Sequence, residues 1–187
     1  MMVDARIVKS QQALVLAGLK LINKNKEISL SDVAKEAGVG RATLYRLYSS
    51  KEALIEAIAL HCLNAFEVAT KPIEQLATST MHAFELLFEL TMPLTDESQF
   101  LMSLDYFADD IPQVNDIIAK QDEELWDLIE EAKQAGQLEK SLPTSWVLNL
   151  IEGLYYAGWV QQQEYQASAK QAAALAFQSF SRAVTPL

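Results

Sequence analysis

Apolar residues recur at intervals of three and four along nearly the whole chain of 187 residues. This is the spacing of one face of an α-helix, and the alternating runs of β-branched residues that are typical of half-buried strands do not occur. The sequence therefore predicts an all-α fold with about nine helices. We expect them over about residues 5–24, 30–37, 41–47, 50–70, 72–91, 97–108, 112–136, 145–163 and 169–184.

The ends of these helices are marked by residues that can satisfy free backbone groups. A Ser or Asp three residues before a Glu or Gln can form a capping box at a helix start, and a Gly beyond the last turn can take the positive φ of a C-terminal cap. Helix starts are expected at the pairs Ser49–Glu52, Asp96–Gln99 and Ser168–Gln171, and at Ser29; helix ends are expected at Gly38 and Gly136.

The charge of the chain is divided unevenly. Residues 1–51 hold nine basic and four acidic residues, a formal +5, whereas residues 52–187 hold six basic and 21 acidic residues, a formal −15. A basic segment beside an acidic one is typical of a protein of which one part meets a polyanion, although ordinary sampling of surface charge gives such asymmetry too. We expect a domain over residues 1–50 and another over residues 51–187.

The sequence lacks the residues that several classes of protein require. Cys62 is the only cysteine, so no disulfide within the chain and no zinc site with paired thiolates can form. No Gly-rich phosphate loop, nucleophile elbow or Glu-x-x-His pair occurs, and we expect no enzymatic activity, no cofactor and no metal. Without a secretory leader or a run of 18 apolar residues, we expect a cytoplasmic protein that meets no membrane.

Residues 29–48 have the spacing of a helix-turn-helix. The small Ala34 stands where two helices cross, and Gly38, four residues later, can take the positive φ that the turn requires. Leu44 follows six residues beyond, and Val33 and Val39 complete the apolar anchors. The alternative is an ordinary helical hairpin, but hairpins seldom need so short a second helix with Thr, Tyr and Arg facing outward.

The stretch from Ser29 to Leu54, and above all its segments 32–38, 43–45 and 50–54, resembles the DNA-binding domain of the TetR (tetracycline repressor) family. The resemblance extends, through the first predicted helix, to about residues 1–50. It implies that the third helix enters the major groove of double-stranded DNA. The DNA contacts are then expected from Ser31, Arg41, Ala42, Thr43, Tyr45, Arg46 and Lys51.

The chemistry of these residue types suits DNA. Arg41 can donate two hydrogen bonds to guanine, Thr43 can offer its methyl group to thymine, and Tyr45 can donate to a phosphate. Lys51 adds a positive charge at a helix start, where free backbone N–H groups also attract phosphate. Two positions depart from the family pattern: Gly40 replaces the usual capping residue, and Leu47 stands where His or Tyr is frequent, so we expect no phosphate contact at residue 47.

Residues 51–187 match no motif, but the resemblance implies that they form a helical domain for dimerisation and for binding a small-molecule inducer. The predicted helices 145–163 and 169–184 are apolar nearly all round, with small residues such as Gly153, Ala157 and Gly158 that permit close helix approach. We expect them to form a homodimer that reads a palindromic operator; the alternative is that both helices are buried within one subunit.

An inducer pocket needs apolar and aromatic side chains, although aromatic residues at helical spacing also form simple cores. Asp105, Asp109 and Glu152 can meet a cation, and the candidate lining residues are Met81, Phe84, Phe88, Tyr106, Trp126, Tyr155 and Trp159. The resemblance implies a homodimeric repressor that a small molecule releases from DNA. The alternative is a helical adaptor protein that does not bind DNA.

Overall fold

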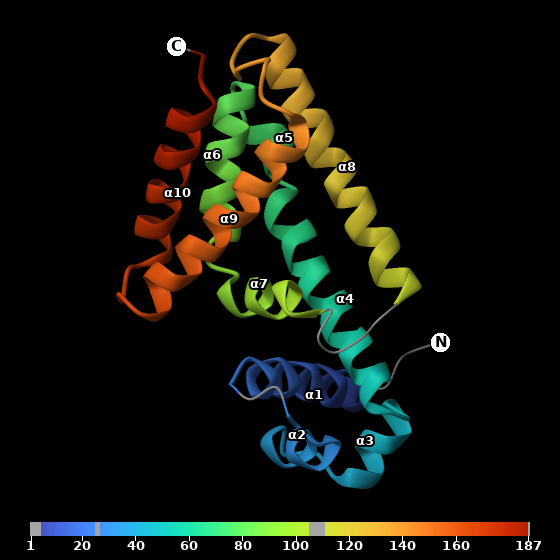
Figure 1. Ribbon diagram of the computed structural model, residues 1–187. Helices are drawn as coiled ribbons and strands as arrows, with labels where there is room; N and C mark the ends of the chain where they lie inside the picture. The colour runs from blue at the N-terminus through green and yellow to red at the C-terminus, as the bar shows by residue number, and fades with distance from the viewer. Residues whose placement is uncertain (1–4, 25–26, 105–110, 187) are drawn as a thin grey trace. The chain divides into compact units, whose positions relative to one another are not determined.

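The computed structural model describes residues 5–24, 27–104 and 111–186, and within them it contains ten α-helices (Figure 1). The prediction of an all-helical chain is confirmed. The helices are α1 (Ala5–Lys24), α2 (Leu30–Glu36), α3 (Arg41–Leu47), α4 (Lys51–Thr70), α5 (Ile73–Leu76), α6 (Thr80–Thr91), α7 (Thr95–Met102), α8 (Pro112–Gln134), α9 (Thr144–Gln163) and α10 (Ala169–Val184).

The chain forms two compact units, each made of two stretches of sequence. The first unit comprises residues 1–64 and 96–115, and the second comprises residues 65–95 and 116–187. The first unit therefore contains all of α7 except its first residue, Thr95, and this part of the chain follows 31 residues of the second unit in the sequence. Residues that are distant in the sequence thus belong to the same unit. The division into two domains after residue 50 stays a prediction.

The helix expected over residues 72–91 is in fact two helices, α5 and α6. The hydroxyl of Ser79 accepts a hydrogen bond from the backbone N–H of His82 and caps the start of α6. The ring of His82 in turn accepts a hydrogen bond, 3.1 Å long, from the backbone N–H of Thr78. These two local bonds lie where α5 has ended and α6 begins. The apolar stripe that predicted one helix therefore continues across a short non-helical segment.

Most of the predicted helix ends are confirmed, and two differ. Capping boxes are present at Ser29 and Ser168, and Gly38 and Gly136 have positive φ. The box at Ser49 is wrong: the hydroxyl of Ser50 accepts the hydrogen bond, from the backbone N–H of Ala53. The box at Asp96 is also wrong because α7 already begins at Thr95, which places Asp96 within the first turn.

The core of the first unit joins α1 to the first half of α4. Leu14 and Ile58 are fully buried there, and Gly18 lets the two helices approach closely. A Cβ atom added at Gly18 would lie 2.7 Å from the Cδ1 atom of Ile58, which is closer than packed carbon atoms lie. The side chain of Asn23, near the end of α1, also donates to the backbone oxygen of Asp96 in α7 at 2.8 Å.

The core of the second unit is formed by α6, α8, α9 and α10. Three aromatic rings lie at its centre: Phe84 and Phe88 from α6 and Phe180 from α10, all fully buried. The ring centroids of Phe84 and Phe180 are 4.8 Å apart, within the range of favourable aromatic contacts. On α9, Gly158 lies against Met92, and a Cβ atom there would come within 2.5 Å of the Met92 sulfur.

One described helical segment, Lys51–Leu76, is long and apolar enough to cross a membrane by length and composition alone, with a mean hydropathy of 1.4. A core helix of a globular protein meets the same criterion. Leu54, Ile55, Ile58 and Leu63 of this segment are buried within the first unit. The absence of a membrane partner stays a prediction.

Candidate nucleic-acid interface

The helix-turn-helix geometry of α2 and α3 is set by a few buried side chains. Val33 and Leu44 are fully buried, and Ala34 is 2% exposed where the helices meet. Gly38 takes a φ of +64° in the turn, and the backbone N–H of Val39 donates to the oxygen of Ala34 at 2.9 Å. Ala34, Gly38 and Leu44 thus form the helix-turn-helix that their spacing predicts.

Two polar clusters hold α2 in place. At its start, the hydroxyl of Ser29 accepts from the backbone N–H of Asp32 and donates to its carboxylate at 2.6 Å. This hydrogen bond, with that from the Ser29 backbone, lowers the pKa of Asp32. Near its end, Glu36 forms an ion pair with Lys20 of α1 at 2.5 Å, which lowers the pKa of Glu36.

The outer face of α3 consists of four exposed side chains, those of Arg41, Ala42, Tyr45 and Arg46. Tyr45 keeps 53% of its surface exposed. All four were predicted as DNA contacts. The fifth predicted contact of this helix, Thr43, is half-buried and lies at the border of the outer face.

The remaining predicted contacts flank α3. Ser31 in α2 and Lys51 at the start of α4 are both half-buried. Glu52, next to Lys51, accepts a backbone hydrogen bond and one from Ser50, and these bonds lower its pKa. Gly40 is the N-cap residue of α3 and provides no side-chain cap. Leu47 is half-buried, and the expected lack of a phosphate contact there stays a prediction.

The arginines of α3 are not held in ion pairs by neighbouring carboxylates. Among the described residues, neither Arg41 nor Arg46 is part of an ion pair. Of the carboxylates of α2, Glu36 is paired with Lys20, and Asp32 is hydrogen-bonded to Ser29, with the charges of Lys35 and Arg41 also contributing to its lowered pKa. An exposed helix face with two unpaired guanidinium groups is suited to a polyanionic partner.

The candidate inducer residues fall into separate places. Phe84 and Phe88 belong to the packed core of the second unit, and Met81 and Tyr155 pack against it. Trp126 is 42% exposed on α8 and does not join them. Trp159 is half-buried, and its ring nitrogen is buried without a hydrogen-bond partner. Glu152 is exposed; Asp105, Tyr106 and Asp109 lie outside the described residues.

Two polar groups within the second unit were missed by sequence reasoning. The hydroxyl of Tyr155 lies 2.6 Å from that of Thr91, and burial raises the pKa of Tyr155. Lys133, 8% exposed, donates to Thr144 at 2.5 Å, and Thr144 in turn donates to Glu130. Neither group follows a local sequence pattern, because each joins residues from different helices.

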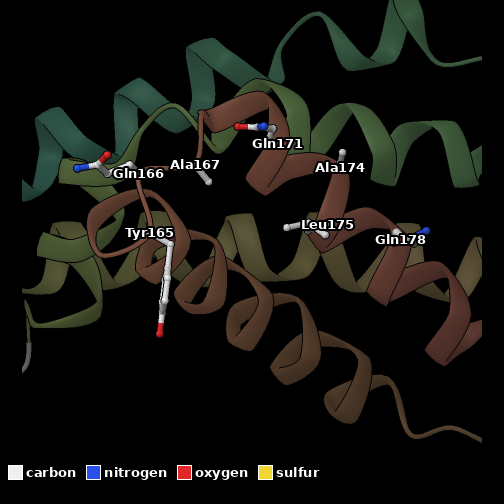
Figure 2. A pocket seen from close by; sticks show the side chains of 7 residues that line it. All are labelled: Tyr165, Gln166, Ala167, Gln171, Ala174, Leu175 and Gln178. Atoms are coloured by element: carbon white, nitrogen blue, oxygen red, sulfur yellow. The ribbon is translucent and has the colours of Figure 1, made fainter.

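The outer side of α9 and α10 is hollowed. A hollow of about 240 Å³ runs between the two helices and is lined mainly by small and aliphatic residues, among them Ala157, Gly158 and Leu175. A second, of about 620 Å³, lies at the turn between them; Figure 2 shows Tyr165 beside this turn and Leu175 on α10. Leu175 is 50% exposed and Tyr165 67% exposed, so this side of the pair presents apolar surface.

The described residues hold no group of three or more His, Cys, Asp or Glu side chains placed to bind a metal ion. Cys62 is buried, and burial raises the pKa of its thiol, with Glu97 and Asp96 contributing. A thiol in such surroundings is a poor nucleophile and a poor metal ligand.

Known proteins are similar to this chain at two levels, the helix-turn-helix segment and the fold of nearly the whole chain. Residues 26–58 match the model of the bacterial regulatory proteins of the tetR family. The whole fold is similar to that of LfrR from Mycobacterium smegmatis, a TetR-like transcriptional regulator solved in complex with proflavine. The TM-score is 0.79 at 20% identity, over 98% of this chain and 100% of LfrR. Residues 26–58 thus carry a tetR-family helix-turn-helix, and the chain has the fold of TetR-like regulators.

Other solved structures of regulators share the fold at low identity. The ketosteroid regulator KstR2 of Mycobacterium tuberculosis superposes with a TM-score of 0.76 at 14% identity, over 100% of this chain and 98% of KstR2. The fatty acid degradation regulator FadR of Bacillus halodurans superposes with a TM-score of 0.71 at 15% identity, over 91% of this chain and 97% of FadR. No curated protein matches the chain. The family model thus covers α2, α3 and the first part of α4.

Proposed function

We propose that this chain is a non-enzymatic, cytoplasmic transcriptional repressor of the TetR family that binds double-stranded DNA through α3. The observation that carries the proposal is the outer face of α3, where Arg41 and Arg46 are exposed and unpaired on either side of Ala42 and Tyr45. In helix-turn-helix proteins the second helix of the motif lies in the major groove. A short helix with this face is suited to that position.

The predicted contacts take different roles along the groove. Arg41, Ala42 and Thr43 start the helix and lie nearest the base edges. Tyr45, Arg46 and Lys51 supply donors and positive charge for phosphates, and Ser31 of α2 donates its hydroxyl to a phosphate. Phosphate contacts fix the position of the protein on the duplex, and base contacts select the sequence.

The protein acts as a homodimer through α9 and α10 in this proposal. Their outer side is poor in charge and rich in small residues, and it is hollowed along Ala157 and Leu175. An apolar face of this kind on a helix pair is typical of a surface that another subunit covers. A dimer presents two recognition helices about 34 Å apart. This distance matches two half-sites of a palindromic operator that lie one turn of DNA apart.

A small molecule releases the repressor in this proposal. LfrR was solved with proflavine, and KstR2 is described as a ketosteroid regulator; both are structures of the same fold. The aromatic centre of the second unit is closely packed, and its buried hydroxyls, Tyr155 and Thr91, bond to each other, so a ligand that enters there must displace side chains and offer a polar group to this pair. Helix α4, which has residues in both units, is the element that we expect to transmit the ligand's effect.

The proposed DNA binding is tested by selection from a pool of random duplexes with the full chain. We expect enrichment of a palindrome whose half-sites lie about one helical turn apart. A helical adaptor that does not bind DNA would enrich nothing, and this outcome would overturn the proposed function. Release is tested by adding small aromatic compounds, proflavine among them, to the complex; a compound that binds the protein but leaves its DNA affinity unchanged would contradict the release mechanism.

The dimer is tested by light scattering on purified Ala157→Glu protein. This substitution places a carboxylate on the exposed apolar side of α9, and we expect it to convert a dimer to a monomer. Ala119→Glu, at an exposed alanine of α8, makes the same chemical change outside α9 and α10, and we expect it to stay dimeric. A monomeric wild-type protein, or dimeric Ala157→Glu, would contradict the proposed interface.

A further inference from the structure

We infer that Arg41 recognises a guanine, and Ala42 the methyl group of a thymine, in each half-site of the operator. This inference rests on the proposed function, because it requires α3 to lie in the major groove. It adds what the operator must contain, from the side chains that α3 presents.

The outer face of α3 has a restricted chemistry. It comprises two guanidinium groups, one phenol and one methyl group, from Arg41, Arg46, Tyr45 and Ala42. The helix, with the sequence RATLYRL, contains no carboxylate and no side-chain amide. Its core side is formed by Leu44, which is fully buried, and the half-buried Leu47.

Each base pair presents a different set of groups in the major groove. Guanine presents two acceptors, N7 and O6, which match the two donors of a guanidinium group; thymine presents a methyl group. Adenine is best matched by Asn or Gln, and the amino group of cytosine by Asp or Glu. Because α3 has none of these four residue types, its exposed side chains favour guanine and thymine.

The guanidinium groups are free to make such contacts. The two carboxylates of α2 are held by partners within the first unit: Asp32 by Ser29 and Glu36 by Lys20. No described carboxylate forms an ion pair with Arg41 or Arg46. The charge of Arg41 contributes to the lowered pKa of Asp32, but neither arginine forms an ion pair that DNA would have to break.

The two arginines cannot take the same role. Five residues of helix separate them by about 7.5 Å along the axis and by about 140° around it. Arg41 is the first residue of α3, and the N-terminal residues of a recognition helix are those that contact base edges. We therefore assign base recognition to Arg41 and a phosphate to Arg46. Ala42, next to Arg41, lies against a neighbouring base pair.

The test uses the full chain and two duplexes, the selected operator and a random-sequence duplex, with dissociation measured by fluorescence anisotropy at constant salt. Arg41→Ala should weaken binding to the operator by about 5- to 150-fold, and binding to the random duplex by about threefold or less. Arg46→Ala, the matched control, should weaken both duplexes by similar factors. Binding by the unaltered protein should also weaken when one guanine is replaced by 7-deazaguanine, which lacks N7, or one thymine by uracil, which lacks the methyl group.

The outcomes separate this inference from the proposed function. If no duplex binds, both fail. If the operator binds but its half-sites lack guanine, or 7-deazaguanine binds as well as guanine at every position, DNA binding stands and the assignment of Arg41 is overturned. The assignment of Ala42 is overturned if uracil binds as well as thymine throughout. The base replacements use the unaltered protein, so these results do not depend on whether Arg41→Ala folds.

Discussion

The Nζ atom of Lys20 lies 2.5 Å from a carboxylate oxygen of Glu36, and this ion pair ties the end of α2 to α1. Both side chains are partly exposed, at 55% and 38%, so solvent and salt screen the attraction. The pair keeps a carboxylate of α2 occupied beside a helix that we expect to meet phosphates. Its main effect is therefore on the charge and position of α2 rather than on overall stability.

Replacing Lys20 with Ala should lower the urea midpoint of unfolding slightly at neutral pH. The pKa of Glu36 is lowered in the folded protein, first by its hydrogen bond to Lys20. Its contribution is therefore fully present above the unfolded pKa of about 4.3 and is lost as the pH falls through the lower, folded pKa. The difference between the variant and the unaltered protein should shrink below about pH 4. A difference that grows in acid would contradict this account.

Removing a helix cap should separate stability from DNA binding. Ser29→Ala removes the hydroxyl that caps α2 and should cost about 1 kcal/mol of unfolding free energy. Ser168→Ala removes the equivalent capping box of α10 in the second unit and should cost a similar amount. Urea melts measure both, and a gel shift should show a loss of DNA affinity for Ser29→Ala alone. Equal losses of affinity for the two variants would indicate that the cap of α2 has no specific role.

The contact between Gly18 and Ile58 should tolerate no added carbon. Gly18→Ala places a Cβ atom 2.7 Å from Ile58 Cδ1; such overpacking should cost about 1–3 kcal/mol, and the higher helix propensity of Ala should offset about 1 kcal/mol of that cost. Ile58→Val removes that Cδ1 atom. The double variant should therefore be less destabilised than the sum of the two single variants, as chemical unfolding of all four proteins will show. Strict additivity would mean that the two residues do not meet.

The hydroxyl of Thr144 should be essential to the polar cluster between α8 and α9. Thr144→Val leaves the buried amino group of Lys133 with one partner fewer, and we expect a loss of about 1–3 kcal/mol in unfolding free energy. Thr144→Ser retains the hydroxyl and should lose less. Because the bond from Thr144 lowers the pKa of Glu130, the penalty of Thr144→Val should diminish in acid. Equal stability of the Val and Ser variants would disprove a role for this hydroxyl.

Local features of the fold were predictable from the sequence. The caps at Ser29 and Ser168 each depend on a partner three residues away, and the turn at Gly38 depends on one backbone angle. The start of α6 was missed because Ser79 has no Glu or Gln three residues on; His82 stands there instead. Pro72 suggested a single helix start, and the apolar pattern continued across the break.

Features that depend on packing were not predictable. Asn23 contacts Asp96 across 73 residues of sequence and joins α7 to the first unit, and no local pattern encodes this pairing. Phe84 and Trp126 both stood at helical spacing, yet one is fully buried and the other is 42% exposed. The exposed side of α3 was easier to predict, since the helix-turn-helix spacing itself determines which side of the helix is covered. The contacts of that side with DNA stay a prediction.

The most direct test of the account is the salt dependence of binding to a random-sequence DNA duplex, measured by fluorescence anisotropy. Affinity should fall steeply as salt rises, and Lys51→Ala should reduce the slope of log affinity against log salt by about one for each phosphate contact removed. Lys140→Ala, which removes an exposed lysine of the second unit, should leave the slope unchanged. No binding at low salt, or the same change in slope for both variants, would contradict the assignment of α3 and its surroundings as a DNA-binding surface.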